Sequence, residues 1–328
     1  MRSPRRWPPS CPSRYSGKNY WGGRDSGADP MTVEVAVPAS IANLGPGFDA
    51  LGMAVNLYDR FRVSIADGPA VSFSGADAAA LAGEPAPLVL RAAEAAARRS
   101  GRPAAFAIEA RLAIPVTRGL GSSAAAIVGG AVAANELLGR PLDQEALLDL
   151  AARLEGHPDN VAAALLGGVV VVTREGESLR AGRFLPRLDL EIALAIPDRV
   201  VPTKEARALL PRTVPLADAV FNVSRVALLV TALLTGDGAL LPAALHDRLH
   251  QPHRARLLPG FAAVVVAARE AGAYGAVLAG SGSTVAAFTP PGRAERVGEA
   301  MRQAFARHGV AAETRTVYVD AHGATVRS

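Results

Sequence analysis

The segment that decides the fold reads Pro115-Val116-Thr117-Arg118-Gly119-Leu120-Gly121-Ser122-Ser123-Ala124-Ala125. An alternating apolar stretch, residues 105–112, precedes it and predicts a strand, and a charge-free run, residues 124–134, follows it and predicts a helix. Gly119 and Gly121 allow backbone conformations that other residues resist, and they let a ligand come close. The segment is therefore expected to be a glycine-hinged loop between a strand and a helix.

Ser122 and Ser123 stand where this helix is expected to begin. The first N–H groups of a helix lack partners and lie at the positive end of its dipole, so hydroxyls and N–H groups together favour a phosphate there. A helix cap in a tight turn, without any ligand, is the simpler interpretation of two glycines and a serine, since short motifs match by chance. The rest of the chain must decide between the two.

The chain nearly lacks lysine, which excludes one kind of phosphate loop. Only Lys18 and Lys204 occur among 35 basic residues. A Walker-type loop needs Gly-x-x-x-x-Gly-Lys-Ser/Thr, and the sequence has no such motif. Any nucleotide must then be held by backbone N–H groups and the helix dipole.

Positive charge is concentrated in the first 30 residues. Of a formal net charge of +5, four charges come from this segment, which has six basic and two acidic residues and is rich in proline and glycine. We expect residues 1–30 to form a disordered basic tail, with an arm for an anionic partner as the alternative. The remainder is nearly neutral, which argues against nucleic-acid binding.

Composition points to a globular protein of the cytoplasm. Half of the 328 residues are hydrophobic, enough for one large or two ordinary domains. No charge-free apolar stretch reaches the ~18 residues of a membrane span, so no membrane association is expected. The single cysteine, Cys11, excludes a disulfide framework.

Two further polar segments could line a site. The first, a glycine- and proline-rich loop, reads Pro38-Ala39-Ser40-Ile41-Ala42-Asn43-Leu44-Gly45-Pro46-Gly47-Phe48-Asp49, and the second reads Glu155-Gly156-His157-Pro158-Asp159-Asn160. Asn43 and Asp49 are either turn residues that bond their own backbone or substrate ligands. The second segment holds two carboxylates, an imidazole and an amide in six residues, with a surface turn as the alternative.

Periodicity divides the chain near residue 188. The first part, 31–188, is expected to contain strands at 32–37, 53–65, 105–112 and 169–172 and helices at 87–99, 124–134, 142–154 and 161–166. The second part, 189–328, is expected to contain strands at 189–196, 274–279, 284–288 and 313–319 and helices at 203–210, 216–234, 239–250, 260–271 and 293–308. The second part then has a split βαβ, ferredoxin-like pattern.

The loop 115–125 resembles the phosphate-binding motif of the GHMP kinases, the family of galactokinase, homoserine kinase, mevalonate kinase and phosphomevalonate kinase. Leu278-Ala279-Gly280-Ser281-Gly282-Ser283-Thr284 resembles the third motif of that family. Within it the chain is most similar to the homoserine kinases, because segment 38–49 has neither the Lys and Gly-Glu-His of mevalonate-type kinases nor the Arg-rich version of galactokinases. The resemblance spans about 32–319 and implies an α+β fold of two domains, an N-terminal α/β domain with the phosphate loop at a helix N-terminus and a ferredoxin-like C-terminal domain.

The resemblance implies roles for particular residues. ATP phosphates are expected on loop 115–125, with Mg²⁺ held by Ser123 and Glu155. The expected catalytic residues are Ser123, Glu155, Asp159 and Asn160. The expected L-homoserine ligands are Asn43, Asp49, His157, Thr203, Arg207 and Arg254. Arg207 and Arg254 suit the carboxylate of the substrate and Asp49 suits its ammonium group.

The expected reaction transfers the γ-phosphoryl group of ATP to the L-homoserine hydroxyl, giving O-phospho-L-homoserine and ADP for threonine biosynthesis, and the resemblance also implies a homodimer. Mevalonate and galactose kinases use an aspartate base, whereas homoserine kinases rely on positioning, so Asp159 is expected to line the site rather than to act as a base. The alternatives are another small-molecule kinase of the family, acting on shikimate or a mevalonate derivative, and a non-catalytic nucleotide-binding module.

Overall fold

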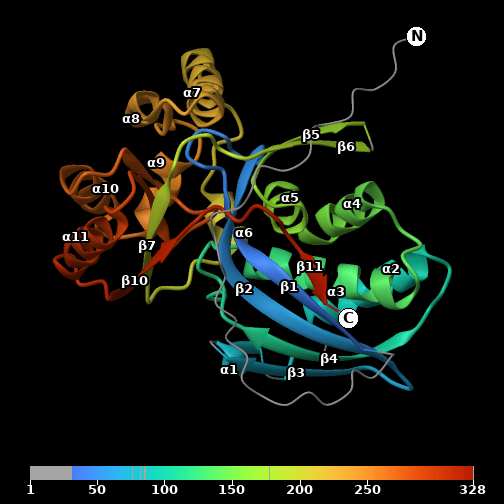
Figure 1. Cartoon of the computed structure of the whole chain (residues 1–328). Coiled ribbons are helices and arrows are strands. Elements are labelled where there is room, and N and C mark those ends of the chain that lie inside the picture. The colour runs from blue at the N-terminus through green and yellow to red at the C-terminus, as the bar shows by residue number, and fades with distance from the viewer. Residues whose placement is uncertain (1–31, 76, 82, 85, 177, 328) are drawn as a thin grey trace, which may run out of the picture.

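The computed structural model describes residues 32–75, 77–81, 83–84, 86–176 and 178–327. The predicted disordered tail, residues 1–30, lies outside these described residues. The rest forms two β-sheets with helices packed against them, which confirms the α+β class (Figure 1).

The first sheet has seven strands and carries helices on one face. Its path is β11-β1-β2-β4-β3, and β5 pairs with the start of β2 and with β6. Its strands are β1 (Thr32–Ala42), β2 (Leu51–Ala66), β3 (Ala70–Gly75), β4 (Ala105–Leu112), β5 (Val169–Glu175), β6 (Ser178–Phe184) and β11 (Thr325–Arg327). The accompanying helices are α1 (Ala78–Leu81), α2 (Leu88–Arg99), α3 (Ser122–Leu137), α4 (Gln144–Glu155) and α5 (Asp159–Leu166). Helices α2 to α5 form the helical layer in Figure 1.

Helix α3 lies at the centre of this layer, and its small residues allow a close approach on two sides. A Cβ atom on Gly130 would lie 2.0 Å from the Val89 carbonyl oxygen of α2, and one on Gly129 would lie 2.3 Å from the Phe61 ring of β2. The charge-free run that predicts this helix is thus explained by burial on both sides. The position of the α3 N-terminus is fixed by this packing.

The second sheet has the order β10-β7-β9-β8 with antiparallel pairing throughout. Its strands are β7 (Glu191–Pro197), β8 (Gly275–Leu278), β9 (Val285–Thr289) and β10 (Ala312–Val317), and α10 (Phe261–Glu270) and α11 (Ala294–Ala306) cover one face. The other elements are α6 (Thr203–Ala208), α7 (Leu216–Thr235), η1 (Gly238–Leu240), α8 (Leu241–Ala244), α9 (Gln251–Arg254) and η2 (Ala255–Leu257). This strand order confirms the predicted ferredoxin-like pattern.

One predicted helix is wrong, three strands are missed, and the predicted loop 38–49 begins later than expected because β1 continues through Ala42. Residues 239–250 form only η1 and α8, because the chain then turns around Asp247, whose carboxylate accepts the N–H groups of Leu249, His250 and Gln251. Strands β3 and β6 are missed because they are mostly exposed and lack a clear apolar alternation. Strand β11 brings the end of the chain back to β1 of the first sheet.

Among the described residues, α7 is the one helix long and apolar enough to cross a membrane by length and composition. It contains Asp218 and Arg225, and its inner residues Leu229 and Leu233 belong to the core of this protein. Its outer residues are considered below.

Asp59 connects the first sheet to the phosphate loop. The side chain is fully buried on β2, and its Oδ1 accepts the N–H groups of Ala113 (2.7 Å) and Ile114 (2.9 Å), just before Pro115. Its Oδ2 is buried without a partner among the described residues. Burial raises the pKa of Asp59 to about 6, against the lowering effect of the two N–H donors.

The raised pKa predicts a pH-dependent stability. Because the folded-state pKa of about 6 lies above an unfolded value near ~3.9, the native state binds this proton more tightly. The stabilisation is complete below pH ~4 and is lost as the pH rises through ~6, by about 3 kcal/mol in all. Asp59→Asn should remove this part of the slope in urea unfolding measured from pH 4 to 7. An unchanged slope in the variant would contradict the assignment.

Candidate active site

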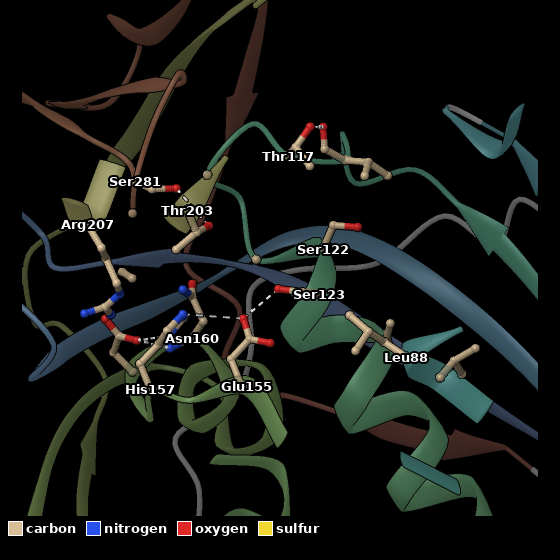
Figure 2. Close-up of a pocket in the computed structure, with 18 of the residues that line it drawn as sticks. Leu88, Thr117, Ser122, Ser123, Glu155, His157, Asn160, Thr203, Arg207 and Ser281 are labelled. Carbon is tan, nitrogen blue, oxygen red and sulfur yellow. Dashed lines mark hydrogen bonds and ion pairs between the residues drawn. The ribbon is translucent and has the colours of Figure 1, made fainter. Parts of the chain in front are cut away.

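Three glycine-containing segments, 38–49, 115–125 and 278–284, and segment 155–160 meet at one pocket of about 310 Å³ (Figure 2). It brings together fifteen of the residues predicted for the site: Asn43, Asp49, Val116, Thr117, Gly119, Gly121, Ser122, Ser123, Glu155, His157, Asp159, Asn160, Thr203, Arg207 and Arg254. Gly280 and Ser281 from the second part of the chain also line it. Every residue predicted to bind the substrate therefore lies at this pocket.

The glycines of the phosphate loop are required by packing as well as by ligand approach. Gly119 (φ 83°) and Gly121 (φ 73°) both have left-handed backbones. A Cβ on Gly119 would lie 2.2 Å from the Ala279 carbonyl oxygen, and one on Gly121 would lie 2.1 Å from the Ser40 hydroxyl oxygen. The loop thus passes between β1 and the Gly280 turn, with no room for a side chain at either glycine position.

The start of α3 faces the pocket with its backbone. Gly121 is the N-cap residue, no side chain caps the helix, and the bond from Ala125 N to the Gly121 carbonyl (2.9 Å) is the first of the helix. The N–H groups of Ser122 and Ser123 precede it and lie at the positive end of the dipole. The interpretation of Ser123 as a helix cap is wrong, because its hydroxyl donates a hydrogen bond to Glu155 and does not accept one from the N–H groups of the helix.

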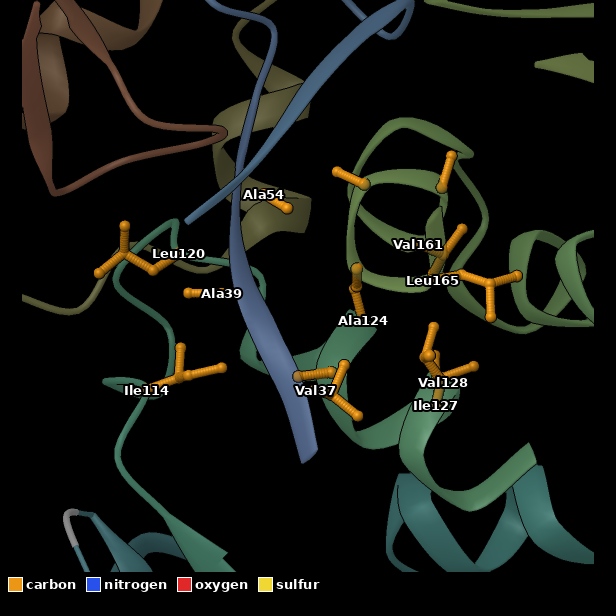
Figure 3. Packing of buried hydrophobic residues seen from close by; sticks show 14 of the residues in the cluster. Val37, Ala39, Ala54, Ile114, Leu120, Ala124, Ile127, Val128, Val161 and Leu165 are labelled. Carbon is orange, nitrogen blue, oxygen red and sulfur yellow. The ribbon is translucent and has the colours of Figure 1, made fainter. Parts of the chain in front are cut away.

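Five residues of the predicted ATP-binding segment do not line the pocket. They are Pro115, Arg118, Leu120, Ala124 and Ala125. Leu120 and Ala124 are buried beside Ile114 and β1 in the core (Figure 3). Arg118 points to the end of β7, where its Nε donates to the Pro197 carbonyl (3.1 Å) and its guanidinium pairs with Asp198 (3.3 Å). These residues place the loop.

A chain of polar contacts runs along one side of the pocket. The Ser123 hydroxyl donates to Glu155 Oε1 (2.6 Å), His157 Nε2 lies 3.7 Å from the same oxygen, and His157 Nδ1 lies 3.1 Å from Asp159 Oδ1. Burial raises the pKa of Glu155. Burial opposes protonation of His157, but its bond to Asp159 and the two neighbouring carboxylates outweigh this and raise the pKa of His157.

Two arginines and Asp49, the charged substrate candidates, also line the pocket. Arg207 donates two hydrogen bonds to Asp49, at 2.9 and 2.7 Å, as a bidentate ion pair. Arg254 is buried, and no carboxylate forms an ion pair with it among the described residues. Burial and then the charge of Arg207 lower the pKa of Arg254 to about 10, so it stays charged at neutral pH.

Asn43 both holds the shape of its own loop and lines the pocket. Its Nδ2 donates to the Gly280 carbonyl (3.0 Å) and its Oδ1 accepts the Asp49 N–H (3.0 Å), so it shapes the turn, as one of the two interpretations of this residue expects. Thr203 Oγ1 lies 3.4 Å from Ser281 Oγ across the pocket. The contact between Asn43 and Gly280 joins the two parts of the chain, whereas the contact between Thr203 and Ser281 lies within the second part.

Two groups of residues at or near the site were not predicted. Ser40 donates its hydroxyl hydrogen to Asn160 Oδ1 (2.8 Å), and although it lies in segment 38–49, nothing in the sequence distinguishes it from an ordinary turn serine. An apolar end of the pocket is formed by Phe73, Leu81, Pro87, Leu88 and Val89. Their hydrophobicity is indistinguishable from that of core residues in the sequence.

Comparison with known proteins identifies the class. The model of the "GHMP kinases N terminal domain" matches residues 87–168, and that of "GHMP kinases C terminal" matches residues 229–307. With the two sheets and the glycine loop at a helix start, the chain belongs to the GHMP kinases.

Relatives identify the branch of the family. The homoserine kinase of Moorella thermoacetica is 47% identical over 293 residues, covering 89% of this chain and 99% of that protein. The homoserine kinase of Synechococcus is 44% identical over 300 residues, covering 90% and 98%. A crystal structure of homoserine kinase from Cytophaga hutchinsonii has a TM-score of 0.83 and 31% identity, covering 93% of this chain and 100% of that one. The chain is thus similar to homoserine kinases over nearly its whole length.

Gly121→Ala should separate the packing of the loop from backbone strain alone. The new methyl group would displace the Ser40 hydroxyl and the start of α3, so nucleotide affinity should fall at least about 10-fold in calorimetric titration with an ATP analogue. Gly101→Ala is the matched control, because Gly101 also has a positive φ (70°) but nothing within 4 Å of the added Cβ. Equal losses of affinity in both variants would contradict a specific role for Gly121.

Proposed function

We propose that this chain transfers the γ-phosphoryl group of ATP to the hydroxyl of L-homoserine, producing O-phospho-L-homoserine and ADP for threonine biosynthesis. One observation carries the proposal: Asp49, Arg207 and Arg254 lie together at a pocket that also holds the α3 N-terminus. A carboxylate and two guanidinium groups match the two charges of an amino acid. The homoserine kinase relatives support the same substrate.

ATP would extend from the apolar end of the pocket to the start of α3. Phe73, Leu81 and Leu88 offer a surface for the base, and the N–H groups of Ser122 and Ser123 offer donors to the phosphates. Because the chain lacks a P-loop lysine, this backbone cradle must supply much of the phosphate binding.

Mg²⁺ fits the donor set at Ser123 and Glu155. A hydroxyl and a buried carboxylate with a raised pKa present hard oxygen ligands beside the phosphate cradle. No group of three or more His, Cys, Asp or Glu side chains in the described part of the chain could hold a metal by itself. The remaining ligands would therefore be phosphate oxygens and water, the arrangement Mg²⁺ favours. The ion would neutralise charge on the phosphates.

Homoserine would place its ammonium group on Asp49 and its carboxylate on Arg207 and Arg254. Arg207 now bonds both oxygens of Asp49, so substrate binding would exchange part of this pair for two new ion pairs. Asn43, His157 and Thr203 line the same part of the pocket and would orient the substrate. Asn160 lies beside the phosphate cradle and would face the reacting hydroxyl.

Asp159 is a poor candidate for a catalytic base. Its Oδ1 already accepts the Asn160 N–H (2.9 Å) and faces His157 Nδ1, so its charge is used to hold segment 157–160. The transition state for phosphoryl transfer is loose, and positioning with charge stabilisation supplies most of the catalysis. We therefore infer a reaction without a dedicated base, in which Ser123, Glu155 and Asn160 position the metal and the hydroxyl.

Coupled ADP release with a panel of acceptors tests the proposed substrate. L-homoserine should be preferred over L-threonine, L-serine, shikimate and mevalonate. Preference for shikimate or mevalonate would indicate another kinase of the family. ATP binding without turnover of any acceptor would indicate a non-catalytic nucleotide-binding module.

Asp159→Ala and Glu155→Gln should differ in their effects. Asp159→Ala should retain kcat within about 10-fold, because no base is lost, whereas Glu155→Gln should lose about 10²-fold or more and require more Mg²⁺. Steady-state kinetics over a Mg²⁺ series measures both. A loss of ~10³-fold or more in Asp159→Ala would establish a base instead.

We further propose a homodimer formed through the outer face of α7, and a cytoplasmic setting suited to an ATP-dependent biosynthetic enzyme. Leu216, Val220, Val223 and Leu234 are exposed by 80, 60, 71 and 42%. Their spacing places them on one side of the helix, as in the seam of a helix pair. The nearby charges are bound within the chain, since Asp218 pairs with Arg248 and Arg225 stacks on Phe221. An uncharged face of this kind can pair with its own copy across a twofold axis without repulsion.

Light scattering across a concentration series tests this face. The wild type should be dimeric and Val223→Glu monomeric, while Val266→Glu, at an exposed valine of α10, should remain dimeric. A monomeric wild type, or a dimer unaffected by Val223→Glu, would contradict the proposal. Binding of the wild type but not Val223→Glu to lipid vesicles would assign the face to a membrane instead.

We propose, finally, that the division near residue 188 separates two domains. Strands β1 to β6 belong to the first sheet, and the second sheet begins with β7. Strand β11 departs from a simple division, because it pairs with β1.

A further inference from the structure

We propose that His250 is a positioning residue for substrate binding, which orients Arg254 so that its Nε and NH2 groups together face the substrate carboxylate. The inference rests on the proposed function, because it concerns the guanidinium assigned to that carboxylate. His250 itself is fully buried and does not line the pocket.

The contacts of His250 determine which nitrogen carries its proton. Nε2 lies 2.7 Å from the Gly45 carbonyl oxygen, an atom that can only accept a hydrogen bond. The Asp247 carboxylate, at 3.5 Å, also lies nearest to Nε2 and favours a proton there. Nε2 is therefore the donor, and the ring is held by stacking on Phe48, with centroids 5.2 Å apart.

The other nitrogen must then accept. Burial, with the charge of Arg254, lowers the pKa of His250 against the opposite effect of Asp247 and Asp49, so the ring is neutral at physiological pH. A neutral ring with its proton on Nε2 has a bare Nδ1. The group facing Nδ1 is Arg254 NH1, at 3.3 Å.

Arg254 NH1 thereby has both of its hydrogens in use. One bonds to His250 Nδ1, and the other bonds to the Gly280 carbonyl oxygen (3.0 Å). By contrast, Nε is buried without a partner among the described residues. Nε and NH2 form the opposite edge of the guanidinium plane, and two parallel donors on one edge are what a carboxylate binds bidentately. Arg254 lines the pocket, and the proposal places this unpartnered edge on the substrate carboxylate.

Gly280 and Gly45 belong to two different loops of the site. The Gly280 turn contacts the phosphate loop, and Gly45 lies in the loop that carries Asp49. His250 therefore couples the orientation of Arg254 to the loop that presents the acceptor for the ammonium group. A change at His250 should affect homoserine binding and leave ATP binding unchanged.

Two substitutions separate the two bonds of the ring. In His250→Gln the amide reaches the place of Nε2 and can still donate to Gly45, but no acceptor remains for Arg254. In His250→Asn the amide oxygen stands near the place of Nδ1 and can still accept from Arg254. We expect His250→Gln to raise the KM for homoserine about 10-fold or more, with the KM for ATP within about 2-fold, and His250→Asn to recover most of the loss.

A double-mutant cycle with Arg254→Lys tests whether His250 acts through Arg254. Lysine cannot present two parallel donors, so His250→Gln should have little further effect on the KM for homoserine in that background. His253→Gln is the control, since His253 lies on the same helical turn and makes no side-chain hydrogen bond in the described part of the chain.

Three results would overturn the role of His250. One is an equal rise in the KM for homoserine in His250→Gln and in His250→Asn. Another is a parallel rise in the KM for ATP together with a lower melting temperature, which would indicate a merely structural role. The third is an equal rise in the KM for homoserine when His250→Gln is made in the wild type and in Arg254→Lys. Failure of the wild type to phosphorylate homoserine would instead overturn the proposed function, so the two failures are distinguishable.

Discussion

The close passage of the phosphate loop between β1 and the Gly280 turn is the constraint on which the site depends. A Cβ atom on Gly119 would lie 2.2 Å from the Ala279 carbonyl oxygen, so backbone meets backbone there, and a Cβ atom on Gly121 would lie 2.1 Å from the Ser40 hydroxyl oxygen. The loop must follow this path for the α3 N-terminus to face the pocket. Because the Gly280 turn belongs to the second part of the chain, the same contact brings Arg207 and Arg254 near the phosphate cradle.

Burial of charge explains why the pocket suits charged ligands. Arg254 is buried without an ion-pair partner in the described part of the chain, and Glu155 is buried with a raised pKa. A carboxylate ligand would pair with the first and a cation with the second, so each proposed ligand would relieve a cost that the folded protein already bears. Asp49 and Arg207 instead satisfy each other until a zwitterion offers both a partner.

Sequence reasoning predicted the loops better than some of the regular elements. Gly119, Gly121 and the polar segment 155–160 each allowed a plain cap or surface turn by themselves, and it was their combination with the other family motifs that favoured a site. The ferredoxin-like order was also predicted, since apolar runs alternate clearly there. Helix 239–250 was wrong, because a single side chain, Asp247, turns the backbone through three hydrogen bonds that periodicity does not reveal.

The residues that sequence could not assign act through tertiary contacts. Arg207 and Arg254 were singled out among many arginines by family resemblance, and only the fold brings them to Asp49 and Gly280. Ser40, although it lies in segment 38–49, and His250 bond other site residues, and no local pattern indicates either contact. Their contributions require knowledge of which distant segments meet.

The central claim is that the pocket recognises both charges of an amino-acid alcohol beside a bound nucleotide. The most direct measurement is coupled ADP release with L-homoserine, 4-hydroxybutyrate, which lacks the ammonium group, and 3-aminopropanol, which lacks the carboxylate. Rapid turnover of L-homoserine with a loss of kcat/KM of at least about 100-fold for each analogue is predicted, since one analogue leaves the buried Arg254 without its carboxylate and the other leaves Asp49 without its ammonium group. Comparable turnover of either analogue would contradict the account.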